Sequence, residues 1–218
     1  MTRTITVKGT GNVSVKPDEI ELRLKVEGAD AVYDRAMAKA AQVLEKLRNA
    51  LMEIGFEKDA LKTTDFGIST RNKSVTEPGT RTTRYVFWRY ECVNRLKLTF
   101  DMDMELLSKT LNAIAVCAAD PDLSIRFTIK DPAAASEALL KAAAANARAK
   151  AEVLCAASGV TLGELVTINY NWGELDIYSD TGINMRDDGI MREAACAPDI
   201  TPDDIDLSDT VTFVWEIR

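Results

Sequence analysis

The stretch KDPAAASEALLKAAAANARAKAEVLCAASGVTLGELVTI, residues 130–168, specifies a helix and a following strand almost completely. Asp131 can cap the first helical turn, and Pro132 suits the first helical position because no N–H donor is needed there. Gly159 is expected to end the helix, since glycine readily adopts the left-handed conformation of a helix C-terminus. The residues that follow favour a strand. The stretch therefore predicts how the chain is built, but it contains no group that performs chemistry.

The expected helix has three different faces when its residues are placed at about 100° per residue. One apolar arc, expected to cover a sheet, holds Leu139, Leu140, Ala143, Ala147, Ala151, Leu154 and Cys155. A narrow charged stripe separates this arc from a face that is almost pure alanine, with Ala138, Ala142, Ala145 and Ala149 as its assembly candidates. Two interpretations of that face remain open. Alanine either maximises helix propensity on an exposed side, or it admits a second element or subunit at close range.

The rest of the chain alternates between strand and helix patterns. Residues 5–15 and 20–26 alternate as strands, with a turn expected at 9–12 and a bulge or bend at Pro17. Further patterns predict helices over 30–54 and 103–118, strands over 64–71, 85–100, 123–129 and 211–217, and an exposed hairpin loop over 72–83. The predicted order is ββαββαβαββ, an α+β fold with antiparallel sheet hairpins packed against helices. We expect one domain over residues 1–218, with an irregular acidic excursion at about 173–209.

Charge and composition exclude several classes of partner. The chain of 218 residues has a formal net charge of −7, which argues against nucleic acid because that affinity rests mainly on Lys and Arg. No segment approaches the ~20 apolar residues that a membrane-spanning helix needs. The N-terminus lacks the pattern of a signal peptide, so we expect a cytoplasmic protein, or a periplasmic or envelope-associated one if a leader was removed. Four cysteines without a close pair are expected to be free thiols.

A search for catalytic groups finds few candidates. The chain has no histidine, which removes the commonest general base and the commonest transition-metal ligand. No nucleophile elbow or phosphate-binding loop appears, so the sequence predicts no catalytic residue and no cofactor. The acidic excursion could hold a hard cation through Asp203, Asp204 and Asp206, with Asp187, Asp188 and Asp209 nearby in sequence. A solvated acidic loop explains the same residues, because their spacing lacks the ligand pattern of a calcium loop.

An aromatic cluster, Tyr85, Phe87, Trp88 and Tyr90, lies beside Arg84 and Arg89 in the long expected strand. Its alternation favours packing in the core on one face of the sheet. The alternative is a surface that stacks on a ligand or a partner, for which Trp88 and Tyr90 are the candidates.

Four pieces of the sequence together resemble the SIMPL-domain family. They are ITVKGTGNVSVKPDEIEL, LKTTDFGIST, RYECVNRLKLTF and the helix–strand stretch from Asp131 to Ile168, in this order over roughly residues 4–172. The family consists of bacterial proteins of poorly defined function, including exported immunogenic antigens. The resemblance implies an α+β domain, assembly into ring- or channel-like homo-oligomers, and a link to the envelope or to stress responses. It brings no catalytic residues, and the excursion after Gly173 is longer and more acidic than the family pattern.

Two functions from different classes follow from these observations. The first is a non-enzymatic, self-assembling structural or interaction protein, a homo-oligomer whose physiological role is stress- or envelope-related by resemblance. The alternative is an enzyme or ligand-binding protein that uses the acidic excursion with a divalent cation. Mass in solution, and thermal stability with and without Ca²⁺ or Mg²⁺, distinguish the two, because a ligand that binds only the folded state raises stability.

Overall fold

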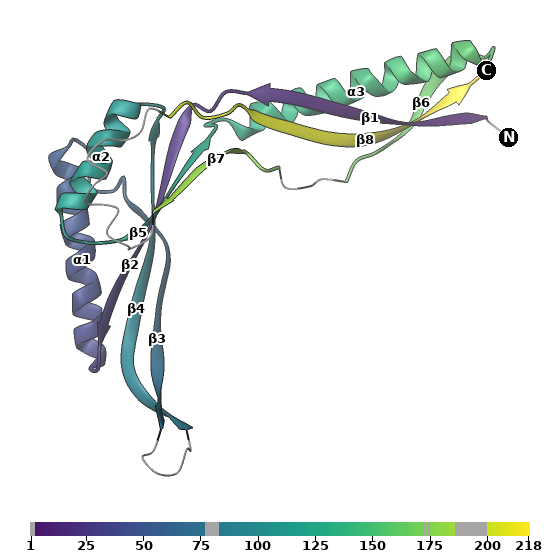
Figure 1. The fold of residues 1–218 in the computed structure, drawn as a ribbon. Helices are drawn as coiled ribbons and strands as arrows, with labels where there is room; N and C mark the ends of the chain where they lie inside the picture. The colour runs from purple at the N-terminus through teal and green to yellow at the C-terminus, as the bar shows by residue number, and fades with distance from the viewer. Residues whose placement is uncertain (1–2, 77–82, 172, 174, 186–199) are drawn as a thin grey trace. The chain divides into compact units, whose positions relative to one another are not determined.

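A computed structural model describes residues 3–76, 83–171, 173, 175–185 and 200–218 of the chain (Figure 1). Within these residues the elements follow the order ββαββαβαβββ, with three helices and two antiparallel sheets. The α+β class is confirmed, and the predicted order lacks only one strand. The chain divides into two compact units, the first made of Met1–Asp18, Phe127–Thr181 and Pro202–Arg218, and the second of Glu19–Arg126 and Gly182–Thr201. The single domain expected over residues 1–218 stays a prediction.

The first unit is a three-stranded sheet with one helix on it. Its strand order is β1 (Thr4–Val15), β8 (Ile205–Ile217), β6 (Leu162–Asn169), and α3 (Pro132–Ala157) packs on β1 and β8. β1 pairs with β8 without interruption, from Thr4 opposite Glu216 to Val15 opposite Ile205. The turn expected at residues 9–12 is therefore wrong, because its two glycines lie inside a continuous strand.

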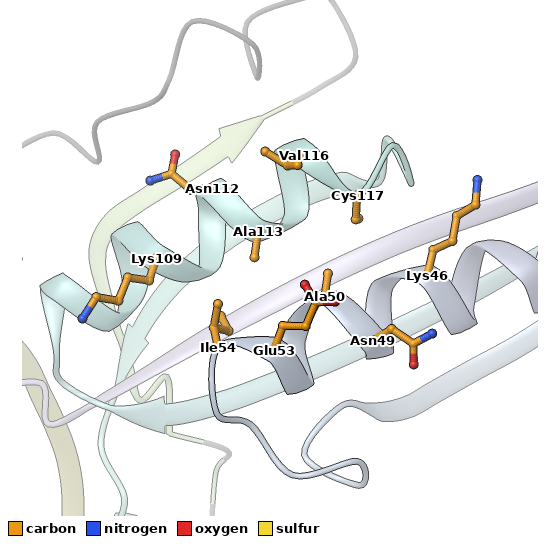
Figure 2. Close-up of a pocket in the computed structure, with 10 residues that line it drawn as sticks. All are labelled: Lys46, Asn49, Ala50, Glu53, Ile54, Lys109, Asn112, Ala113, Val116 and Cys117. Atoms are coloured by element: carbon orange, nitrogen blue, oxygen red, sulfur yellow. The ribbon is translucent and has the colours of Figure 1, made fainter.

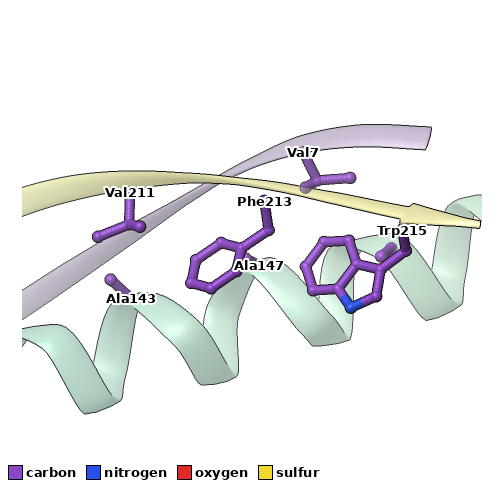
Figure 3. Packing of buried hydrophobic residues seen from close by; sticks show 7 residues of the cluster. Val7, Ala143, Ala147, Val211, Phe213 and Trp215 are labelled. Carbon is purple, nitrogen blue, oxygen red and sulfur yellow. The ribbon is translucent and has the colours of Figure 1, made fainter. Parts of the chain in front are cut away.

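The two glycines of β1 allow α3 to approach the sheet closely. A Cβ atom added to Gly9 would lie 2.0 Å from the carbonyl oxygen of Ala143, and one added to Gly11 would lie 2.1 Å from that of Leu139. The facing helix residues are small as well, and together with the aromatic pair Phe213 and Trp215 they form the core of this unit (Figure 3). The core cluster consists of Val7, Ala143, Ala147, Ala151, Val211, Phe213 and Trp215.

The ends of α3 follow the sequence signals. The Asp131 side chain accepts a hydrogen bond from the backbone N–H of Ala134 at 2.9 Å, and Pro132 is the first helical residue. The helix stops before Gly159, which has φ of +69°. The predicted sheet-facing arc is confirmed for Leu139 and the buried alanines, whereas Leu154 is half exposed on the helix surface.

The second unit contains most of a five-stranded sheet. Its strand order is β3 (Lys62–Thr76), β4 (Thr83–Asp101), β2 (Glu19–Asp30), β5 (Asp122–Thr128), β7 (Tyr178–Met185). One face of the sheet is apolar and covered by α1 (Tyr33–Glu53) and α2 (Met104–Val116) (Figure 1). The buried residues of these elements include Ile20, Leu22 and Leu24 of β2, Leu96 and Leu98 of β4, Ile125 of β5, Leu47 of α1, and Leu107 and Ile114 of α2. The other face carries charged side chains, as the alternation of β2 predicts.

The structure corrects three further expectations from the sequence. The expected irregular excursion at 173–209 contains β7 and the beginning of β8, and β7 is the strand missing from the predicted order. At Pro17 the chain has no bulge but leaves the sheet of β1 and enters the sheet of β2, which explains the exchange of the apolar phase. The expected loop at 72–83 is shorter, because β3 continues to Thr76 and β4 begins at Thr83; residues 77–82 lie outside the described residues.

Candidate functional site

The hairpin of β3 and β4 extends beyond the rest of its sheet. The last residue pair between β2 and β4 joins Asp30 to Tyr90. Residues 83–89 of β4 therefore pair only with β3 among the described residues. We call this two-stranded segment, residues 71–76 and 83–89, the arm. Figure 1 shows it running past the N-terminal end of α1. Both faces of the arm are therefore left without a helix in the part of the unit that the structure describes.

A β-bulge at Trp88 decides which side chains share a face of the arm. Arg71 pairs with Arg89 and Asn72 pairs with Phe87, so Trp88 is the extra residue. One inserted residue exchanges the two faces of a strand. As a result Tyr85 and Phe87 lie on the same face as Tyr90. In a regular strand, odd-numbered and even-numbered residues would lie on opposite faces.

The aromatic face of the arm, which we define as Tyr85 and Phe87, continues a row that begins at Tyr33 of α1 and passes through Tyr90. The Tyr33 and Tyr90 rings meet edge to face with their centroids 5.6 Å apart, and the Phe87 and Tyr90 rings are 5.1 Å apart. The row becomes more exposed along the arm, with Phe87 48% and Tyr85 78% accessible. Their cross-strand neighbours are small polar residues, and on the described part of the arm no charged residue shares this face.

The opposite face of the arm, its cationic face, holds Arg71, Lys73, Arg84 and Arg89 by the strand register. The Arg89 guanidinium lies 4.2 Å from the centroid of the Trp88 ring, a cation–π contact. Trp88 is itself 47% exposed. No acidic residue occurs within 71–76 or 83–89, although the whole chain has a net charge of −7. The arm therefore concentrates positive charge on an acidic protein.

Glu91 lies at the base of the cationic face and orders two of its guanidinium groups. Its side chain is 5% exposed and accepts hydrogen bonds from Arg71 Nε at 2.5 Å and from Arg89 Nη2 at 3.0 Å. Burial alone raises the pKa of the Glu91 carboxyl, but the hydrogen bonds from Arg71 and Arg89 outweigh it, so the pKa lies below its usual value. Glu91 stays ionised and holds both arginines against the sheet.

The arrangement of the aromatic cluster differs from the interpretation favoured by the sequence. Packing in the core is wrong for Tyr85, Phe87 and Trp88, which are exposed, and Tyr90 is partly covered by Tyr33. The physical reason is that β4 continues beyond its last pair with β2, where no helix covers either face among the described residues, and alternation alone could not reveal this. The role of Trp88 and Tyr90 in a partner surface stays a prediction, now with an exposed surface around them.

The alanine candidates on α3 fall into two groups. Ala138 and Ala142 are half-buried beside the sheet, whereas Ala145 and Ala149 are exposed. The buried row at Ala143, Ala147 and Ala151 is explained by the core of its own unit. The assembly role of the exposed row stays a prediction.

The edge strand β6 is a more apolar surface, which the sequence analysis missed. It forms the last strand of its sheet, pairing with β8 only among the described residues. Leu165, Val166 and Ile168 are about half exposed, and Leu165 and Ile168 lie opposite Trp215 and Phe213 of β8. The run LVTI, residues 165–168, predicts a strand, but the sequence alone does not distinguish an exposed edge strand from a buried one.

The acidic candidates do not converge on one point. The Asp203 backbone is tied to β7, accepting from Ser179 Oγ at 2.7 Å and donating to Thr181 Oγ1 at 3.1 Å. Asp206 belongs to β8 and pairs with Ser14 of β1. Asp204 is exposed just before that strand, and Asp187 and Asp188 lie outside the described residues. Among the residues that the structure describes, no group of three or more His, Cys, Asp or Glu side chains could hold a metal ion.

An open groove lies between α1 and α2. Its lining is mixed: Ala50 of α1 and Ala113 of α2, with Ile54 and Cys117 at the helix ends, lie among lysine, asparagine and glutamate side chains (Figure 2). Burial raises the pKa of the Cys117 thiol, which disfavours the reactive thiolate. Cys92 and Cys155 are buried free thiols, and Cys196 lies outside the described residues.

A comparison with known protein families shows to which family the chain belongs. The model of the SIMPL family, described as a protein of unknown function (DUF541), matches residues 5–215. The chain belongs to the SIMPL family. The SIMPL match covers nearly the whole sequence and includes β1, the arm and α3, which confirms the resemblance. No curated protein matches the chain, and within the described residues this SIMPL protein has no helix long and apolar enough to cross a membrane.

Proposed function

We propose that this SIMPL protein is a non-enzymatic, self-assembling structural or interaction protein that associates with further copies of itself. The single observation that carries the proposal is the apolar edge of β6. An edge strand offers unpaired N–H and C=O groups to any other strand, and natural proteins usually protect such edges with lysine or proline. β6 contains neither residue.

The side chains of β6 favour association as strongly as its backbone does. Leu165, Val166 and Ile168 are about half exposed, and the only charge in the strand is Glu164. Pairing with the edge of a second copy would satisfy the free backbone groups and remove these side chains from water. Burying them stabilises association at roughly 25 cal/mol per Å² of apolar surface. A stress- or envelope-related role is the physiological setting that we propose, on the family resemblance.

The mass in solution tests the proposal. By size-exclusion chromatography with light scattering, we expect a multiple of the 24.0 kDa chain mass. Val166→Lys together with Ile168→Lys places charges on the edge and should reduce the mass to that of one chain. Val153→Lys is the matched control, because Val153 is 68% exposed on α3 and not on β6.

Three results would count against the proposal or against the interface on β6, each in a different way. A wild-type mass of 24.0 kDa at high protein concentration would exclude self-assembly. Loss of assembly in Ala145→Glu with Ala149→Glu, but not in the β6 variant, would move the interface to the alanine face of α3. Stabilisation of a monomer by Ca²⁺ or Mg²⁺ would instead support the ligand-binding alternative.

A further inference from the structure

The arm carries two kinds of side chain on two opposite faces, and this separation restricts what can bind it. Tyr85 and Phe87 lie on the aromatic face, whereas Lys73, Arg84 and Arg89 lie on the cationic face with Trp88. A partner that uses both sets of side chains must therefore contact the ribbon from both sides. Neither face is covered by another element among the described residues.

We propose that the arm inserts into the headgroup region of a lipid bilayer that contains anionic lipids. The headgroup region surrounds an inserted ribbon, so it can meet both faces at once. Tyrosine and tryptophan rings favour this region because one end of each is apolar and the other polar. Arginine and lysine reach the lipid phosphates with their charged ends while their aliphatic stems stay in contact with apolar groups.

The backbone of the arm sets the depth of insertion. Over residues 71–76 and 83–89 the ribbon has only two strands. Each strand therefore has one edge without backbone partners among the described residues. Unpaired N–H and C=O groups are too costly in the hydrocarbon core, but water in the headgroup region can satisfy them. The arm therefore binds at the interface and does not cross the bilayer.

The same geometry disfavours single-stranded nucleic acid. Such a ligand stacks its bases on aromatic rings while nearby cations on the same surface neutralise its phosphates. Here the aromatic row of Tyr85, Phe87 and Tyr90 has no cation on its own face.

Charge complementarity favours anionic lipids over neutral ones. Arg71 and Arg89 share the Glu91 carboxylate, and with Lys73 they outnumber this one negative charge even when Arg84 is left out of the count. Glu91 also fixes both guanidinium groups at the base of the face. Each basic residue near an anionic membrane surface contributes about 1 kcal/mol, which corresponds to about a fivefold change in partitioning.

Vesicle flotation with the full chain tests the proposal. We expect binding to vesicles of phosphatidylcholine mixed with phosphatidylglycerol, and much weaker binding to phosphatidylcholine alone. Lys73→Gln with Arg84→Gln should reduce partitioning about 25-fold, the product of about fivefold for each residue. Lys109→Gln with Lys141→Gln removes the same charge from α2 and α3 and is the matched control, expected to bind as the wild type does.

The aromatic face needs its own variant, because cations alone would adsorb to any anionic surface. Tyr85→Ser with Phe87→Ser should weaken binding about tenfold or more, since it removes two side chains that would be buried at the interface. Val116→Ser with Val153→Ser is the control, as both valines are highly exposed outside the arm. Circular dichroism checks that each variant is folded.

A measurement on Trp88 keeps the test independent of variants in the arm. In a Trp172→Phe background only Trp88 and the buried Trp215 fluoresce, so quenching by lipids brominated near the headgroup reports insertion of the arm. Quenching together with a blue shift supports the proposal. Three results would each overturn it: the absence of quenching, equal vesicle binding by the wild type and by Tyr85→Ser with Phe87→Ser, or binding to a single-stranded oligonucleotide in place of vesicles.

Discussion

At the scale of single residues, Glu91 shows how a buried carboxylate is kept charged on a surface. Its two oxygens accept from Arg71 and Arg89, and the side chain is almost fully removed from water. Both arginines are more exposed than the carboxylate, so they also shield it from solvent. Removing the charge would leave two guanidinium groups without their shared partner, and we expect the base of the arm to loosen.

The pH dependence of stability tests this arrangement through Glu91→Gln. Because the folded state holds the Glu91 pKa below its ordinary value of 4.5, the ionised carboxylate stabilises the fold above that pH. This contribution is lost as pH falls through the folded pKa. Denaturant unfolding should show the wild type more stable than Glu91→Gln by about 1–3 kcal/mol at neutral pH, with the difference shrinking below pH 4.5.

A matched control for Glu91→Gln exists on α3. Glu137 pairs with Lys141 in a fully exposed i,i+4 geometry, and solvent-exposed pairs of this kind contribute little to stability. Glu137→Gln should therefore show no measurable difference from the wild type at neutral pH. A Glu91→Gln deficit that stays constant from neutral to acidic pH would contradict the assignment.

At the scale of elements, local signals fixed some parts of the fold and tertiary contacts fixed others. The cap at Asp131, the proline at the start of α3 and Gly159 at its end are local, so the sequence predicts them correctly. Gly9 looks like a turn residue in the sequence because the reason for it, the backbone of α3, lies more than a hundred residues away. The bulge at Trp88 was missed for the same reason, since only the strand register reveals it.

The close approach of α3 to β1 is testable with Gly9→Ala. The new Cβ would lie 2.0 Å from the Ala143 oxygen and 2.6 Å from the Ala147 Cβ, so helix and strand must move apart. Overpacking of this kind costs about 1–3 kcal/mol in the free energy of unfolding. Gly67→Ala in β3 is the control, because a Cβ there meets nothing within 4 Å and should leave stability almost unchanged. Equal effects of the two substitutions would show that α3 does not approach β1 as described.

At the scale of the whole molecule, both units pack a helix closely against a sheet in the same way. Gly28 of β2 faces Ala36 and Ala40 of α1, as Gly9 of β1 faces Ala143 and Ala147 of α3. In each case a strand glycine and a helix alanine bring two backbones together. The chain also passes between the units four times, so neither unit is one continuous stretch of sequence. This interleaving links the folding of each unit to that of the other.

We therefore expect one cooperative unfolding transition for the chain, in agreement with a single domain over residues 1–218. Gly9→Ala in the first unit and Gly28→Ala in the second should each lower the same melting temperature, by about 2–4 °C for each kcal/mol lost. Far-UV circular dichroism follows the helices of both units. In a Trp88→Phe and Trp172→Phe background, the fluorescence of buried Trp215 follows the first unit, so coincident curves indicate a two-state transition. Two separate transitions, each moved by only one substitution, would instead show that the units fold independently, and the chain would then consist of two domains built from interleaved segments.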